Sequence, residues 1–281
     1  MSDRNTTENP LTDKIHPFFV KLATRFWPEL GGRSSEQQFI GVGEIISTLY
    51  SIPFLVAGLI WMIKITDFNQ IRNHYVYFLL FAILIVIFNQ LGFFLIIELR
   101  KNRYGSADGA LTGVPLWSGA LILGPTIFWL PVFWSCYQFI LNWRRATSRT
   151  NQWGLIRNFS MNLVSETLVP LIAFSTYQAI GGQVPLRALS IECILMGMFL
   201  LLIHFLGYAF FWTPYLGYHI WAQQVITGDR DSSVILKFFF LGIGLPQLAN
   251  PFAILAAGLF TQNGLLVFLY FIAGMLTVAY L

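Results

Sequence analysis

Charged residues are scarce in this sequence. Asp, Glu, Lys and Arg together make up 11% of the 281 residues, whereas hydrophobic residues make up 56%. An average soluble domain is about 25% charged, so this composition argues against an ordinary soluble domain. Runs of about 20 apolar residues recur, and a helix of that length crosses the ~30 Å hydrocarbon core of a bilayer. One such run can be a buried core helix, but a series of them predicts an integral membrane protein.

Cysteine is also rare, and its placement argues against a metal site. The two cysteines, Cys136 and Cys193, lie inside apolar runs without metal-ligand spacing. Such placement is typical of small packing residues. The sequence has no HExxH motif and no paired histidines, and these are the usual signs of a catalytic zinc site. We therefore expect no metal and no cofactor.

Signatures of catalysis are missing as well. The sequence contains no Gly-rich phosphate loop and no recognisable Ser-His-Asp arrangement. Asp229 and Asp231 in the polar stretch 228–233 can contact a cation, but a turn and a helix cap are their plainer role. The net charge is only +4, and the distribution of basic residues indicates membrane orientation. We expect neither an enzyme nor a nucleic-acid-binding protein.

The apolar runs predict an all-α, polytopic membrane bundle that forms one domain over residues 39–281. Residues 1–38 precede it as a cytoplasmic or interfacial segment, because residues 14–30 mix aromatic and basic side chains as an amphipathic helix at a membrane surface does. A tail that faces the aqueous phase is the alternative. The predicted apolar stretches are 39–64, 75–98, 114–142, 159–180, 188–212, 234–260 and 264–281.

Basic residues orient these stretches. Cytoplasmic loops are enriched in Lys and Arg, and basic clusters precede the first stretch and flank the third on both sides. A single crossing at 114–142 would place one flanking cluster on the wrong side. The flanking clusters are Arg100, Lys101 and Arg103 before the third stretch, and Arg144, Arg145, Arg149 and Arg157 after it.

The third stretch resolves this conflict if its helix is broken. Gly124 and Pro125 lie near its middle, and proline removes a backbone donor and clashes with the preceding turn. Two half-helices that enter and leave on the cytoplasmic side would make six full spans plus one re-entrant hairpin. Both termini would then be cytoplasmic, in the plasma (inner) membrane of a bacterium. A merely kinked single span is the alternative.

A polar stripe interrupts the fourth stretch. Asn158, Asn162, Glu166 and Pro170 follow one another at helical spacing, and Ser165 borders them. A carboxylate that faces lipid costs on the order of 3 kcal/mol, so this face must turn inward. It either bonds neighbouring helices or lines a cavity that holds water or a polar ligand.

Other polar residues in apolar stretches can join this face. The predicted ligand-binding candidates are Asn162, Glu166, Ser165, Asn89 and Gln90. Glu44, Asn158, Glu192 and His204 rank second, and a lone histidine such as His204 is more typical of packing. We expect a polar pocket between the fourth stretch and its neighbours, bounded by the broken helix.

Two segments resemble a known class of membrane region. "NFSMNLVSETLVPLIAFSTYQAIGGQVPL" (158–186) and "PLWSGALILGPTIFWLPVFW" (115–134) resemble the multi-pass sensor regions of bacterial signalling proteins. These regions are distantly similar to the substrate-binding S components of energy-coupling-factor transporters. The resemblance covers roughly residues 100–281 and implies a module that precedes a cytoplasmic cyclase, phosphodiesterase or histidine kinase domain.

The sequence therefore favours a sensor or receptor module with three partners: the lipid bilayer, a small ligand and a cytoplasmic output domain or partner protein. The apolar run that ends at Leu281 has no anchoring charge, so we expect a continuation into such a domain. A solute transporter and a non-catalytic accessory subunit of a membrane complex are the alternatives.

Overall fold

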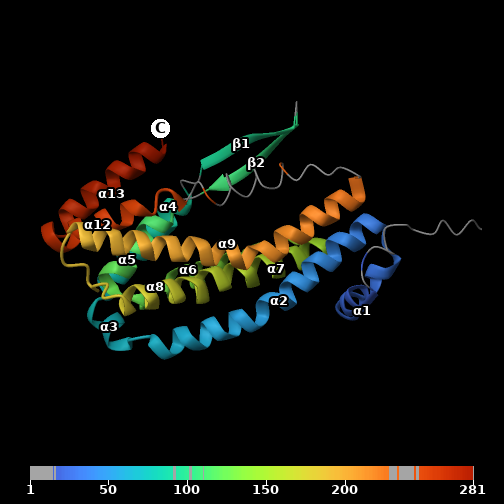
Figure 1. Cartoon of the computed structure of the whole chain (residues 1–281), viewed down its shortest axis with the longest axis horizontal. Coiled ribbons are helices and arrows are strands. Elements are labelled where there is room, and N and C mark those ends of the chain that lie inside the picture. The colour runs from blue at the N-terminus through green and yellow to red at the C-terminus, as the bar shows by residue number, and fades with distance from the viewer. Residues whose placement is uncertain are drawn as a thin grey trace, which may run out of the picture.

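A computed structural model describes residue 15, residues 17–90, 93–100, 103–109 and 111–227, residues 233 and 244, and residues 247–280. The described chain is helical apart from one two-stranded hairpin, which confirms the predicted helical fold (Figure 1). The elements are α1 (Pro17–Phe26), η2 (Pro28–Gly32), α2 (Ser35–Ile65), α3 (Phe68–Asn73), α4 (Tyr75–Gln90), β1 (Phe93–Arg100), β2 (Arg103–Gly109), α5 (Gly113–Leu123), η3 (Pro125–Phe128), α6 (Trp129–Trp143), α7 (Arg149–Glu166), α8 (Leu168–Ala179), α9 (Ile191–Thr227), α12 (Pro251–Asn263) and α13 (Leu265–Tyr280).

Two of these helices are long and apolar enough to cross a membrane. They are Glu36–Ile65 within α2 and Ile191–Ala222 within α9. Shorter apolar helices cover Tyr75–Gln90, Gly113–Leu123 and Leu265–Thr277. The count of six full spans, the membrane side of each loop and the division at residue 38 stay predictions.

The second predicted stretch, 75–98, is too long. Helix α4 ends at Gln90, and β1 pairs antiparallel with β2, with Phe93 opposite Gly109 and Ile96 opposite Ser106. The apolar run thus continues past the helix as a strand. Ile96 and Ile97 are β-branched, which favours the strand, and apolarity alone does not reveal this change of backbone.

The fifth and sixth stretches also differ from their predicted bounds. Helix α9 continues through Pro214 to Thr227, well past residue 212. Helix α12 begins at Pro251, and most of the predicted stretch before it lies outside the described residues, as do Asp229 and Asp231. Helix α13 matches the seventh stretch closely.

The fourth stretch consists of two helices rather than one. Helix α7 ends at Glu166, Thr167 has φ −116° and ψ −79°, and α8 begins at Leu168. Pro170 has no N–H to donate to the Glu166 carbonyl, so a break one turn before it is expected. The Thr167 hydroxyl donates to the Leu163 carbonyl at 2.6 Å. Glu166 consequently occupies the end of a helix rather than its middle.

The third stretch breaks at the predicted position. Helix α5 ends at Leu123, Gly124 has φ +78°, and Pro125 opens the short helix η3 before α6 starts at Trp129. A φ of this sign favours glycine, because a side chain would clash with the backbone. The prediction of a broken helix at Gly124 and Pro125 is therefore confirmed.

The break lies against the C-terminal end of α2. The Gln70 amide donates to the freed Leu123 carbonyl, and the Trp129 indole donates to the Thr66 hydroxyl at 2.7 Å. The two arms then separate, because α5 packs along α12 and α6 packs along α7. The break is held by polar side chains of Thr66, just after α2, and of Gln70 on α3, while the re-entrant hairpin itself stays a prediction.

We expect Gln70→Ala to lower the free energy of unfolding by about 1–3 kcal/mol. The Leu123 carbonyl would lose its donor, and Thr126, whose hydroxyl donates to Gln70 Oε1 at 3.4 Å, would lose its acceptor. Chemical unfolding in detergent micelles measures this difference. Asn69→Ala, at an exposed neighbouring position on α3, is the control and should change stability by less than about 0.5 kcal/mol.

Candidate functional site

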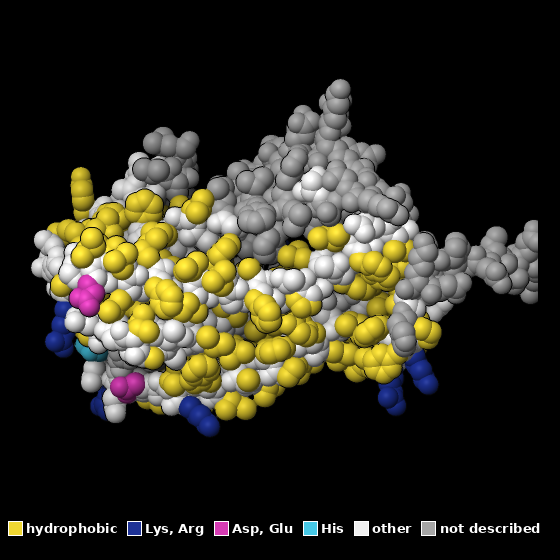
Figure 2. Space-filling model, viewed as in Figure 1, with side chains coloured by type: hydrophobic (Ala, Val, Ile, Leu, Met, Phe, Trp, Pro, Cys, Tyr) yellow, Lys and Arg dark blue, Asp and Glu magenta, His cyan; other side chains and the backbone are white. Residues whose placement is uncertain are grey.

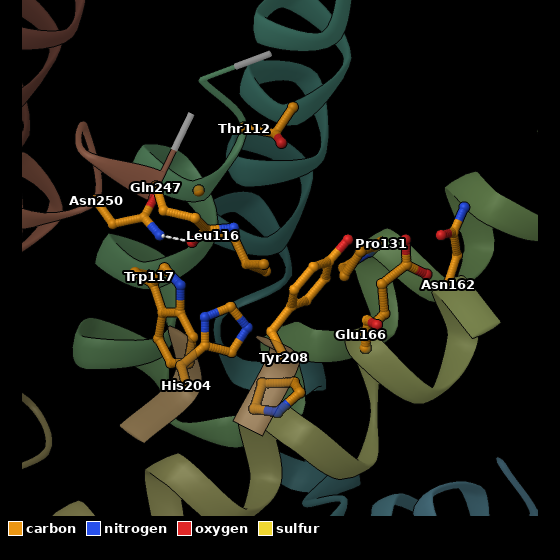
Figure 3. A pocket seen from close by; sticks show the side chains of 13 residues that line it. Thr112, Leu116, Trp117, Pro131, Asn162, Glu166, His204, Tyr208, Gln247 and Asn250 are labelled. Carbon is orange, nitrogen blue, oxygen red and sulfur yellow. Dashed lines mark hydrogen bonds between the residues drawn. The ribbon is translucent and has the colours of Figure 1, made fainter. Parts of the chain in front are cut away.

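A cavity of about 420 Å³ lies between α5 and α6, the two helices on either side of the break (Figure 3). We call it the central cavity. Helices α5, α6, α7, α8 and α9 all contribute to it, as does the segment just before α12. Its described lining is Thr112, Gly113, Leu116, Trp117, Pro131, Asn162, Ser165, Glu166, Pro170, His204, Tyr208, Gln247 and Asn250.

The fourth-stretch stripe reaches this cavity. Asn162, Ser165, Glu166 and Pro170 all line it, and α7 presents Asn162 and Glu166 one helical turn apart. Glu166 Oε1 accepts a hydrogen bond of 2.7 Å from the Ser135 hydroxyl on α6. The expectation that the Glu166 carboxylate has a polar neighbour is therefore confirmed.

Two polar atoms of the cavity lining remain without partners. Glu166 Oε2 and His204 Nδ1 are buried and have no hydrogen-bond partner within the described part of the chain. Buried polar atoms are nearly always bonded, so each exception calls for an explanation. A ligand or water inside the cavity would supply the missing bonds.

Aromatic side chains of α5 and α9 support His204. The Trp117 and His204 rings meet edge to face with centroids 4.8 Å apart, and Tyr208 lies one turn further along α9. Figure 3 shows the Tyr208 ring between His204 and Glu166. The Trp212 indole donates to Ser165 Oγ at 3.0 Å, which ties α9 to α7 beside the cavity.

The opposite end of the cavity consists of residues that the sequence did not single out. Thr112 precedes α5, and Gln247 and Asn250 precede α12. The Asn250 amide donates to Gln247 Oε1. Gln247 and Asn250 lie inside the predicted stretch 234–260, three residues apart, so their helical spacing could have marked them as a polar pair.

A second polar hollow adjoins the cavity. This α6–α7 groove, of about 560 Å³, is lined by Ser135, Gln138, Phe139, Asn142, Leu155, Asn158, Phe159 and Asn162. Asn162 lines both spaces. Ser135, Gln138 and Asn142 follow one another at i, i+3 and i+7, so they form a polar stripe on α6 that sequence spacing could have revealed.

Several predicted residues lie elsewhere. Asn89 and Gln90 do not line the cavity: they occupy the last turn of α4, where Gln90 is exposed, while α4 packs inward through its phenylalanines. Glu192 is exposed at the start of α9. Asn158 lies in the groove.

Glu44 belongs to a separate ion pair. The Arg157 Nε and Nη2 groups donate to its two carboxylate oxygens at 2.7 and 3.2 Å. The Arg157 guanidinium also lies over the Tyr215 ring, 4.3 Å from the centroid. In the sequence Arg157 belongs to a basic cluster that flanks the third stretch, and nothing in its spacing links it to Glu44.

Within the described ranges, no group of three or more His, Cys, Asp or Glu side chains is arranged to hold a metal ion. No protein-family model, no curated protein and no solved structure matches this chain.

Proposed function

We propose that this chain is a multi-pass membrane protein and the sensor module of a bacterial signalling protein. In this proposal its central cavity recognises a small polar ligand, and the bound state is relayed to a cytoplasmic output domain or partner protein. The resemblance of residues 115–134 and 158–186 to sensor regions supports this assignment. The volume of the cavity is within the range of small-molecule sites.

The distribution of side chains supports the membrane location. From Gln37 to Ile63, a helical length of about 40 Å, Glu44 is the only charged residue, and it is paired with Arg157. Residues 193–227 contain no Asp, Glu, Lys or Arg. Large hydrophobic side chains are spread over the visible face, whereas Lys and Arg lie near its margins (Figure 2). Exposed examples are Ile60, Leu79, Ile83, Leu195, Leu202, Leu206, Phe210 and Leu266.

The observation that carries the binding proposal is the pair of unpartnered buried atoms, Glu166 Oε2 and His204 Nδ1, on one cavity. Each buried polar group without a bond costs about 1–3 kcal/mol. Trp27 Nε1 and His219 Nε2 also lack a partner in the described structure but do not line this cavity, whereas Glu166 and His204 both line it. A ligand that bonds both would join α7 to α9. The same two helices meet again at Arg157 and Tyr215, so they offer a physical connection along the bundle.

The α6–α7 groove favours a second candidate function, transport of a solute. Its polar lining continues from the cavity along the helices that lead toward Arg144, Arg145 and Arg149. Uptake of the bound compound into proteoliposomes distinguishes the two functions, because a sensor binds it without moving it across the membrane.

Thermal unfolding of the protein in lipid nanodiscs tests the binding proposal. The compounds are single members of four classes: amines, carboxylates, sugars and nucleosides. We expect one class to raise Tm, since a ligand at 100 times its Kd stabilises the folded state by about 2.7 kcal/mol. In the Glu166→Gln variant, the ligand concentration that gives the same rise in Tm should be at least tenfold higher. The glutamine amide keeps an oxygen that accepts from Ser135, but it has no negative charge.

Glu192→Gln is the matched control. It removes the same charge at an exposed position outside the cavity and should leave the response unchanged. If all four classes leave Tm unchanged, or if both variants respond equally, the central cavity is not a ligand site and the proposal is wrong.

A further inference from the structure

The charge of the central cavity limits what it can bind. Three of its described lining residues have ionisable side chains: Glu166, His204 and Tyr208. Glu166 is the one carboxylate among them, and none of the described lining residues is Lys or Arg. A bound anion would find no fixed positive charge among them, while a cation would find a carboxylate with one oxygen free of partners. Complementarity of charge therefore favours a cation.

The same molecule shows how its helices hold an organic cation. Glu44 on α2 and Tyr215 on α9 enclose the Arg157 guanidinium: the carboxylate accepts two hydrogen bonds, and the ring lies beneath the charge. Such a combination of carboxylate and aromatic face is well suited to a cation that carries N–H donors.

The central cavity repeats this combination without an internal cation. Tyr208 precedes Tyr215 by seven residues, or two turns of α9, so the two rings project from nearly the same face of the helix. Glu166 supplies the carboxylate, and Trp117 adds a second aromatic ring. Where Arg157 fills the first site, the second has a cavity of about 420 Å³.

We infer that the central cavity binds a small organic cation with N–H donors, an alkylammonium or guanidinium compound, with its charged head at Glu166. This inference rests on the proposed function and specifies its ligand class. The head donates to Glu166 Oε2, beside the Tyr208 ring. The alkyl part lies against Leu116, Trp117 and Pro131. The α6–α7 groove, polar and joined to the cavity at Asn162, is the route of entry from water.

Three compounds of matched size test the charge requirement: butylammonium, butanol and butyrate. Each is titrated against the protein in phosphatidylglycerol nanodiscs, whose lipids carry no amine, at constant ionic strength set with NaCl. We expect butylammonium to raise Tm at a concentration at least tenfold lower than butanol or butyrate. Glu166→Gln should remove this preference, and Glu192→Gln should preserve it.

The comparison of the three compounds on the unaltered protein needs no variant, so a variant that fails to fold leaves the test intact. Equal or better binding of butanol or butyrate overturns the inference, and so does the absence of any butylammonium response. The proposed function survives either result if a carboxylate, sugar or nucleoside raises Tm and Glu166→Gln weakens that effect. The proposed function itself is wrong if no compound of the four classes raises Tm.

Discussion

Arg157→Met is expected to lower the free energy of unfolding by about 3–5 kcal/mol. The substitution leaves the Glu44 carboxylate buried, with 7% of its side chain exposed, and without the cation that donates to both of its oxygens. A buried charge without a counter-charge is among the most destabilising changes that a single substitution makes. The cation–π contact with Tyr215 is lost at the same time.

A double variant separates the missing charge from lost packing. Glu44→Leu together with Arg157→Met replaces the pair with apolar side chains, and such replacements are often neutral or stabilising. We expect the double variant to recover most of the stability that the single variant loses. Arg149→Met, at an exposed position in the first turn of the same helix, is the control and should change stability by less than about 0.5 kcal/mol.

Unfolding in mixed detergent and urea, followed by tryptophan fluorescence, measures all three variants. If Arg157→Met is as stable as Arg149→Met, the ion pair has no structural role. If the double variant is no more stable than the single one, the loss comes from packing rather than from the unpaired Glu44 charge.

The sequence could predict the parts of the site that depend on spacing within one helix. Asn162, Ser165 and Glu166 share a face because of the period of the helix, and Gly124 with Pro125 breaks its helix for local backbone reasons. The cavity brings Asn162, Ser165 and Glu166 together with His204. Each of these signals is contained in a few consecutive turns.

Features that depend on contacts between helices could not be predicted in this way. The pairing of Glu44 with Arg157 joins residues 113 positions apart, and the amide pair Gln247 and Asn250 reaches the cavity only through the packing of α12 on α5. Asn89 and Gln90 illustrate the opposite error: adjacent amides in an apolar run predict a buried polar site, yet here they end a helix before a strand. The hydrophobicity of a segment indicates that it is buried, but it does not indicate which other helix the segment packs against.

Gly58→Ala is expected to destabilise the protein by about 1–3 kcal/mol, although alanine is the better helix former. A Cβ at Gly58 would overlap the Thr167 hydroxyl and would lie 2.9 Å from the Leu168 backbone nitrogen. Thr167 cannot simply rotate away, because it is fully buried and its hydroxyl donates to the Leu163 carbonyl. The backbone of α2 or of the α7–α8 junction must move instead.

Gly217→Ala is the control, and it is expected to change the stability in the opposite direction. Gly217 is exposed within α9, and apart from its chain neighbours and the backbone of its own helix nothing in the described structure lies within 4 Å of the position its Cβ would take. Removing the backbone freedom of glycine there should stabilise the protein by about 0.5–1 kcal/mol. If both variants shift the unfolding midpoint in the same direction, the close approach of α2 to Thr167 does not limit stability.

The Gly58 contact also bears on the cavity, because Thr167 directly follows Glu166. A shift of the α7–α8 junction moves the end of α7, and with it the Glu166 carboxylate relative to Ser135 and His204. We therefore expect Gly58→Ala to weaken the ligand response of the nanodisc assay several-fold, and Gly217→Ala to leave it unchanged. A Gly58→Ala protein that loses stability but binds normally would show that the junction tolerates the shift. In that case Ser135, which donates to Glu166 at 2.7 Å, would hold the carboxylate in place from α6.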